Sequence, residues 1–236
     1  MRMDGRAAGE LRPVTVERGF TKHSAGSVLI SFGDTRVLCT ATIEERVPGW
    51  LKDSGKGWVT AEYAMLPGAT HSRTSRDQNN KGRALEISRL IGRSLRAVTD
   101  LRAMGECSIT VDCDVLQADG GTRTAAITGG YLALHDALQS SVDKGFLKKL
   151  PLHAPCAAVS VGLRGDEALL DLNYEEDSSA DVDMNVIMDG ACRIIEIQGC
   201  AEGTPFARPV LDRMMDLAES GIRELLAIQR KALGLA

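Results

Sequence analysis

The sequence has no hydrophobic run long enough to cross a membrane, because none approaches the ~18–20 apolar residues that a span needs. Aromatic residues make up only 4% of the chain, so we expect an aliphatic core. Basic residues are not in excess, since 28 Lys and Arg stand against 32 Asp and Glu. This balance excludes a uniformly basic nucleic-acid binder but leaves a local basic patch open. The opening stretch MRMDGRAAGELRP is charged and precedes no hydrophobic segment, which argues against a secretory signal.

Paired cysteines are also missing, because none of the six forms a C-x-x-C pair and most lie in apolar stretches. We therefore predict reduced thiols in a cytoplasmic protein. The four histidines are scattered without ligand spacing, so we expect surface or turn residues and no zinc site. Common nucleotide-binding, zinc-protease and serine-hydrolase motifs are absent as well.

Hydrophobic periodicity predicts strands and helices in mixed order. Apolar residues recur at three- and four-residue spacing from Arg83 onward and alternate elsewhere. Strands are expected at 27–43 (two, around Gly33-Asp34), 57–66, 107–117, 157–163, 168–174, 184–188 and 192–197, and helices at about 83–101, 124–139 and 209–233. Because strands and helices do not alternate strictly, we predict an α+β fold with largely antiparallel sheets, built as one domain over residues 1–236.

A sharp turn, Asp119-Gly120-Gly121-Thr122-Arg123, joins a predicted strand to a predicted helix. Two glycines allow close approach of a ligand, and the free N–H groups of a helix start suit an oxyanion. Thr122 adds a hydroxyl donor, and Arg123 adds a guanidinium that matches phosphate. An ordinary strand-to-helix turn, with Thr122 or Thr124 as N-cap, explains the pattern equally well.

Basic residues concentrate between positions 73 and 102, where eight Lys and Arg stand against three acids. Arg83 lies at a predicted helix start, which is unfavourable beside the helix dipole unless an anion is shared there. The alternative is a solvated helix face on which Glu86 pairs with Arg89. Arg73 and Arg76, in the preceding polar loop, suit the backbone of a flexible polyanion.

Acidic residues crowd the stretch from 173 to 185, between apolar strands. A hard divalent cation would relieve the repulsion, and Mg²⁺ held by one or two carboxylates usually also holds a substrate phosphate. The alternative is a solubilising loop. Together, a basic anion site and paired carboxylates suggest phosphoryl transfer with a metal. Whether the substrate is a nucleotide, a sugar phosphate or RNA stays open at this level.

Long stretches of the chain resemble the ribonuclease PH family. The similarity is carried by GR…LRPVTVERGFTKH at 5–23, GSVLISFGDTRVLCTATIEERVPGW at 26–50, GWVTAEYAMLPGATHSR at 57–73, EISRLIGRSLRAV at 86–98, DCDVLQADGGTRTAAITG at 112–129, DLNYEEDSSADVDMNVIM at 171–188 and EIQGCAEGTPF at 196–206. The ordered set covers most of the chain and is far more specific than DGGTR alone.

The resemblance implies a fold and an activity. The fold is that of ribosomal protein S5 domain 2 and ribonuclease PH. The activity is that of a bacterial, phosphate-dependent 3′→5′ exoribonuclease (tRNA nucleotidyltransferase). Such an enzyme acts reversibly in tRNA and rRNA processing, trims tRNA precursors and other RNA, and releases nucleoside diphosphates. The resemblance also implies Mg²⁺ as cofactor, inorganic phosphate as co-substrate and a homo-hexamer arranged as a trimer of dimers.

The resemblance also assigns residues to roles. It places phosphate on Arg83, Gly121, Thr122 and Arg123. The catalytic carboxylates, which would also hold the metal, are Asp177 and Asp183, and Asp183 either holds Mg²⁺ or acts as general acid. RNA contacts fall on Arg73 and Arg76.

Two alternative functions compete with this interpretation. A non-catalytic RNA-binding subunit of an exosome-like ring would keep the fold but lose the phosphate arginines or the carboxylates, and this chain retains both sets. A small-molecule phosphotransferase would need a nucleoside-triphosphate loop, and none is visible.

Overall fold

The computed structural model describes residues 2–77 and 82–235. Its first sheet has two central strands in which buried side chains alternate with more exposed ones. Its strands are β1 (Val14–Arg18), β2 (Gly26–Phe32), β3 (Thr35–Glu44), β4 (Trp58–Met65) and β5 (Ser108–Gln117). Their order is β1-β2-β3-β5-β4, and every neighbouring pair is antiparallel except β4 and β5. A short 3₁₀ helix, Gly49–Leu51, lies between β3 and β4.

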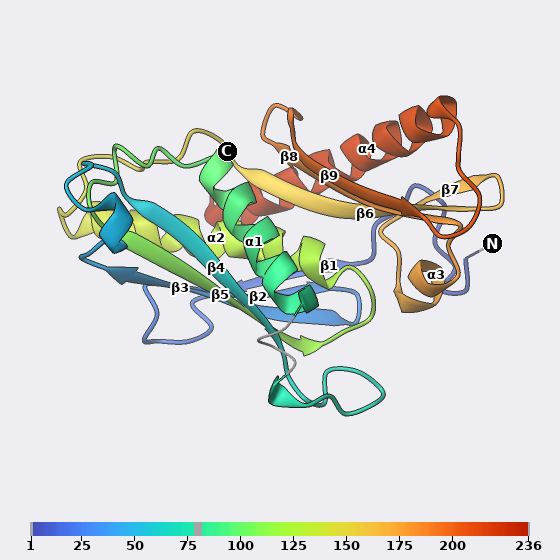
Figure 1. Cartoon of the computed structure of the whole chain (residues 1–236), viewed down its shortest axis with the longest axis horizontal. Coiled ribbons are helices and arrows are strands. Elements are labelled where there is room, and N and C mark those ends of the chain that lie inside the picture. Colours follow the sequence, from blue (N-terminus) through green and yellow to red (C-terminus); the bar gives the residue numbers. More distant parts are fainter. Residues whose placement is uncertain (1, 78–81, 236) are drawn as a thin grey trace.

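Helix α1 (Gly82–Ala97) is the crossover that the parallel pair β4–β5 requires. Ile87, Leu90 and Leu95 are fully buried on one side of it, as their spacing predicted. The helix packs along β4, where Figure 1 shows it lying across the strand. The crossover thus carries Arg83, in its first turn, to the end of the sheet at which β4 finishes.

The second sheet is entirely antiparallel, with the order β7-β6-β8-β9. Its strands are β6 (Cys156–Arg164), β7 (Glu167–Leu170), β8 (Val182–Asp189) and β9 (Ile194–Ala201). All of β6 except Arg164 is buried, because helix α4 (Arg208–Leu233) and helix α2 (Thr122–Asp143) both pack on it. The strands expected at 157–163, 184–188 and 192–197 and the long C-terminal helix are confirmed.

Helix α2 contacts both sheets and is mostly buried. The sequence suggested that Gly129-Gly130 weakens this helix. The structure shows that Gly129 instead permits close packing, since a Cβ there would lie 2.6 Å from Ile30 Cγ2 and 3.0 Å from Cys39 Sγ. One apolar cluster runs from the first sheet through α2 into the second sheet and α4.

Three expectations of local structure were wrong. Strand β1 was not predicted, and the strand expected over 168–174 ends at Leu170. The residues after it form helix α3 (Tyr174–Ser178), which begins in a capping box: the Asn173 side chain accepts from the Glu176 N–H, and the Glu176 carboxylate accepts from the Asn173 N–H. His135, expected at the surface, is only 7% exposed on α2.

All six cysteines are free thiols, as predicted. In the part of the chain that the structure describes, no helix is both long enough and apolar enough to cross a bilayer.

Candidate active site

The turn before α2 is held in an unusual backbone conformation. Gly120 and Gly121 have φ values of 72° and 63°, in the left-handed region that favours glycine. Gly121 is the N-cap of α2, and no side chain in the described residues caps the helix. The expected capping by Thr122 or Thr124 is therefore wrong, since the Thr124 hydroxyl donates back to the Gly121 carbonyl. The N–H groups of the first turn stay available to an anion.

Thr122 points its hydroxyl at a partner that the sequence did not reveal. Its Oγ1 lies 2.7 Å from the Tyr63 hydroxyl, and both residues are buried. Burial raises the pKa of Tyr63, while the positive charges of Arg83 and Arg123 act against that shift. Tyr63 therefore stays a neutral phenol that fixes the orientation of Thr122 close to both arginines.

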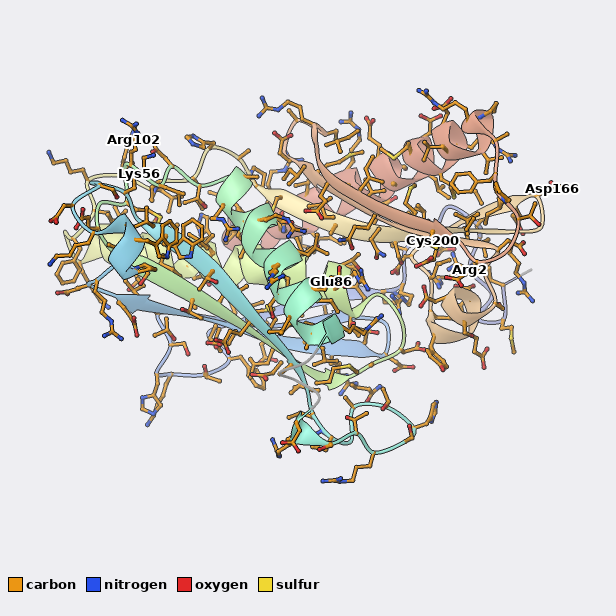
Figure 2. All side chains as sticks on the ribbon, in the orientation of Figure 1. Arg2, Lys56, Glu86, Arg102, Asp166 and Cys200 are labelled. Atoms are coloured by element: carbon orange, nitrogen blue, oxygen red, sulfur yellow. The ribbon has the colours of Figure 1, made fainter. Side chains whose placement is uncertain are left out.

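Arg123 crosses from α2 to the second sheet. Its Nη1 donates to Gln198 Oε1 on β9 at 2.8 Å and lies 3.6 Å from Glu86 Oε1 on α1. Gln198 Nε2 in turn donates to Glu86 Oε1 at 3.1 Å. The suggestion that Glu86 pairs with Arg89 is replaced by this contact across the site. Figure 2 labels Glu86 on α1 and shows where this contact lies in the fold.

Arg83 lies in the first turn of α1 and is exposed. Within residues 2–77 and 82–235, no carboxylate forms an ion pair with it. Its positive charge nevertheless acts on both Tyr63 and Asp177. Arg83 is therefore a cation close to the site that is free to take an anionic ligand.

The two predicted carboxylates approach each other from neighbouring elements. Asp177 belongs to α3, and Asp183 lies on β8 between Gly162 of β6 and Cys200 of β9. Partial burial and the charge of Asp183 raise the pKa of Asp177, whereas Arg83 and Arg123 act in the opposite direction. The structure thus brings Arg83, Thr122, Arg123, Asp177 and Asp183 into one site.

The carboxylate pair is a small donor set for a metal. Among the residues that the structure describes, no group of three or more His, Cys, Asp or Glu side chains could hold an ion. Mg²⁺ needs only one or two carboxylates when a substrate phosphate completes its coordination. Burial and, after it, the charge of Asp183 raise the pKa of Asp177, and a cation shared by the two carboxylates would offset that charge. The residues present therefore fit Mg²⁺ only together with a phosphate-bearing ligand.

Arg73 and Arg76 lie apart from these groups. Both are exposed on the loop after β4, which projects from the end of the first sheet in Figure 1. No contact among the described residues joins them to the arginines and carboxylates of the site. Lys81, counted in the basic segment, lies outside the described residues.

Sequence reasoning missed three residues of this site: Tyr63, Glu86 as a partner of Arg123, and Gln198. Each belongs to a regular strand or helix, and its side chain meets its partner only through tertiary packing: Tyr63 and Glu86 contact residues of α2, and Gln198 reaches Arg123 from the second sheet. No local pattern marks such residues, since their partners lie 37 to 112 positions away or come from the other sheet.

An α+β fold that directs two arginines and an uncapped helix start toward two carboxylates defines a protein built to handle a phosphorylated ligand. Comparison with protein-family models narrows this class. Residues 10–138 match domain 1 of the 3′ exoribonuclease family, and residues 154–221 match its domain 2. The chain therefore belongs to the 3′ exoribonuclease family. The family includes phosphorolytic exoribonucleases, for which inorganic phosphate is the co-substrate.

Solved structures confirm the fold. Rice (Oryza sativa) Rrp46 superposes with a TM-score of 0.78 at 19% identity, covering 98% of this chain and 100% of its own. A chain of the Archaeoglobus fulgidus exosome with RNA bound to the active site gives 0.82 at 21% identity, covering 98% and 92%. A chain of an archaeal exosome core gives 0.79 at 21%, covering 97% and 91%. The predicted α+β ribonuclease PH fold with mixed, largely antiparallel sheets is thus correct.

Proposed function

We propose that this chain is a phosphate-dependent 3′→5′ exoribonuclease of the bacterial ribonuclease PH type. It trims the 3′ ends of tRNA precursors and other RNA and releases nucleoside diphosphates. The observation that carries the proposal is the meeting of Arg83, Arg123 and the uncapped start of α2 with Asp177 and Asp183. A phosphate bound by the first three lies beside the carboxylates, where a second phosphate ester can be held.

The phosphate half of the site binds and orients the nucleophile. Arg83 and Arg123 neutralise inorganic phosphate, and the α2 N–H groups with the Thr122 hydroxyl fix its orientation. One phosphate oxygen then attacks the phosphorus of the 3′-terminal phosphodiester. The bond from that phosphorus to the 3′ oxygen of the preceding nucleotide breaks, and that oxygen takes up a proton. The products are a nucleoside diphosphate and an RNA one nucleotide shorter. Because a phosphodiester bond is exchanged for a phosphoanhydride bond, the step is reversible.

The carboxylate half stabilises the charge that develops on the leaving 3′ oxygen. Asp177 and Asp183 would hold Mg²⁺, which supplies positive charge at the reacting phosphorus when it is bound. Asp183 alternatively donates the proton as general acid. In both cases the carboxylates act on the RNA phosphate, while the arginines act on the attacking phosphate.

Three further parts of the proposal concern the protein around the site. Arg73 and Arg76 contact the RNA backbone, because they are exposed cations on a projecting loop. The chain folds as one domain, which the apolar cluster shared by both sheets supports. It works in the cytoplasm as a homo-hexamer, a trimer of dimers.

The second candidate is a non-catalytic RNA-binding subunit of an exosome-like ring. The structural neighbours favour it, because rice Rrp46 and the archaeal chains all come from exosome proteins or exosomes. Against it stand the arginines and carboxylates, which this chain keeps in one site.

The deciding experiment incubates 3′-tailed RNA with the purified protein, with and without inorganic phosphate, and identifies the released nucleotides. The proposal requires nucleoside diphosphates that appear only with phosphate. Nucleoside monophosphates formed without phosphate would indicate a hydrolase. RNA binding without any product would favour the ring-subunit alternative. Arg123→Ala tests the phosphate site in the same assay. Loss of a charge-assisted contact of about 1.5–3 kcal/mol should raise the KM for phosphate at least tenfold.

A further inference from the structure

Three arginines near the start of the chain are buried, although arginine almost always stays at the surface. Arg2, Arg6 and Arg12 are 6%, 9% and 4% exposed. Their partners Asp171 and Glu176 are 0% and 4% exposed. We call these five residues the N-terminal clamp. Buried charges are costly unless geometry and hydrogen bonds are complete, and the mechanism above uses none of the five.

Arg12 holds the turn before α2 to Asp171. Its Nε and Nη2 donate to the two Asp171 carboxylate oxygens at 3.0 and 2.7 Å, and its backbone N–H donates to Oδ2 at 2.8 Å. The Nη1 of the same guanidinium donates to the Asp119 carbonyl oxygen. From the other side, the Thr35 hydroxyl donates to the Gly120 carbonyl at 2.6 Å. One planar group therefore connects the start of α2 to the residues that precede α3.

The turn has little other support on the side of Arg12. A cavity of about 1100 Å³ lies there, with Arg12, Asp119 and Tyr174 in its wall. On the remaining side Gly120 packs directly on the chain before α3, because a Cβ at Gly120 would lie 2.6 Å from the Leu172 carbonyl oxygen. The turn and the start of α3 are thus in contact, and two side chains join them: Arg12 through Asp171, and Asp119, whose Oδ1 accepts from the Tyr174 N–H at 3.2 Å.

Arg2 and Arg6 hold α3 itself. Arg2 donates from Nε and Nη2 to both Glu176 carboxylate oxygens at 2.6 Å, and Figure 2 shows it beside α3. Arg6 Nη1 donates to the Asp171 carbonyl at 3.0 Å, as does Arg2 Nη2. Glu176 directly precedes Asp177. Asp171, at a φ of 52° that is uncommon for a residue other than glycine, is shared by all three arginines.

We propose that the N-terminal clamp positions the two halves of the active site: Arg12 sets the phosphate half through the turn at 119–121, and Arg2 sets the carboxylate half through Glu176. The inference rests on the proposed function. The two arms predict different kinetic effects, because only Arg12 bonds directly to the turn at 119–121 and only Arg2 forms a two-point ion pair with Glu176, beside Asp177. Neither arginine touches the reacting atoms, so both are positioning residues.

The test uses the full chain with Arg12→Lys and Arg2→Lys. Lysine keeps the charge beside Asp171 or Glu176 but lacks the fork that reaches a second partner. Arg12→Lys should raise the KM for phosphate about tenfold or more, since small misplacements have effects of this size. It should raise the Kd for inorganic phosphate equally, measured without RNA from the phosphate-dependent rise in Tm. Arg2→Lys should lower kcat and leave both phosphate constants within about twofold.

The control is Gln229→Leu on α4, which removes buried hydrogen bonds to the Thr128 and Cys156 carbonyls outside the clamp. It should lower Tm without changing the Kd for phosphate. Two results would overturn the proposal. One is a Kd for phosphate that rises as much in Gln229→Leu as in Arg12→Lys. The other is a Kd for phosphate that is unchanged in Arg12→Lys. If Arg12→Lys does not fold, Arg2→Lys decides, and an unchanged kcat overturns the proposal. Wild-type protein that shows neither phosphate-dependent stabilisation nor product would overturn the proposed function together with the clamp.

Discussion

In the proposed mechanism, Glu86 competes with phosphate for Arg123. Its carboxylate lies 3.6 Å from Arg123 Nη1 and receives a hydrogen bond from Gln198, which also binds Arg123. An incoming phosphate must therefore draw Arg123 away from one carboxylate and approach another negative charge. The same contact keeps the arginine near its working position while the site is empty.

Glu86→Gln should therefore lower the KM for phosphate about two- to fivefold, the range expected when a half-exposed ion pair worth roughly 0.5–1 kcal/mol is removed. Steady-state rates over a range of phosphate concentrations would measure it. Glu219→Gln is the matched control, since it removes a carboxylate that pairs with Arg223 on the exposed side of α4. A rise in KM would show that Glu86 orients Arg123 rather than competing for it.

Asp177 carries a stability cost that follows from its pKa. Partial burial and Asp183 raise that pKa in the folded protein, so the folded state binds a proton more tightly than the unfolded state. The ionised carboxylate is then unfavourable at neutral pH, and this cost disappears as the pH falls below the raised pKa. Catalytic carboxylates commonly reduce stability in this way.

Asp177→Asn should consequently abolish activity yet raise Tm at pH 7 by on the order of 1–2 °C, with the gain shrinking in acid. Thermal unfolding across pH, in buffer free of phosphate and divalent ions, would show it. Asp189→Asn should instead lower Tm at pH 7. Although burial raises the pKa of Asp189, hydrogen bonds from Arg193 hold that pKa below its usual value, so the ionised carboxylate stabilises the fold. An Asp177→Asn protein less stable than wild type at pH 7 would contradict the assigned sign.

At the scale of elements, periodicity was sufficient wherever an element has one buried face. Apolar runs on either side of the turn dipeptides Gly33-Asp34 and Asp189-Gly190 located β2–β3 and β8–β9, and three- and four-residue spacing located α1 and α4. Helix α3 escaped because five residues are too few for a period, and its capping box lay inside an acidic run. Strand β1 is short and largely exposed, so it shows no alternation of buried residues.

The two glycines in the middle of α2 differ in the space that each leaves for a Cβ atom. A Cβ at Gly129 would lie 2.6 Å from Ile30 Cγ2, whereas at Gly130 the nearest atom, Val111 Cγ1, would be 3.4 Å away. Gly129→Ala should therefore cost about 1–3 kcal/mol through overpacking. Gly130→Ala should be neutral or add up to about 1 kcal/mol through better helix propensity. Urea unfolding of both variants measures the difference, and equal effects would mean that close packing at Gly129 does not set the sign.

At the scale of the whole molecule, sequence patterns could indicate a basic cluster and an acidic cluster but not their meeting. The two sheets bring Arg83 and Arg123 to Asp177 only through long-range packing. The N-terminal clamp was invisible for the same reason. Arg2 and Glu176 are 174 positions apart, and each alone resembles an ordinary charged residue. The family resemblance supplied the site residues, while the structure supplied the partners that hold them.

The oligomeric state separates the proposed enzyme from the ring-subunit alternative. A homo-hexamer of the 25.3 kDa chain should have a mass of about 150 kDa by light scattering after gel filtration. The Arg12→Lys and Arg2→Lys proteins should give the same mass, because both substitutions act inside one chain. A purified chain that stays monomeric or dimeric at all concentrations would instead indicate a subunit that needs different partners to close a ring.

The N-terminal clamp also bears on how the chain is made. Synthesis proceeds from the N-terminus at roughly 5–20 residues per second, so Glu176 leaves the ribosome about 9–35 seconds after Arg2. Until then the three arginines near the start of the chain lack their complete set of buried partners, and Arg2 cannot hold α3. A nascent or prematurely terminated chain therefore holds a basic surface but no assembled site. The clamp can therefore close only after the chain up to Glu176 has left the ribosome, and the proposed capacity to degrade RNA would appear only after that step.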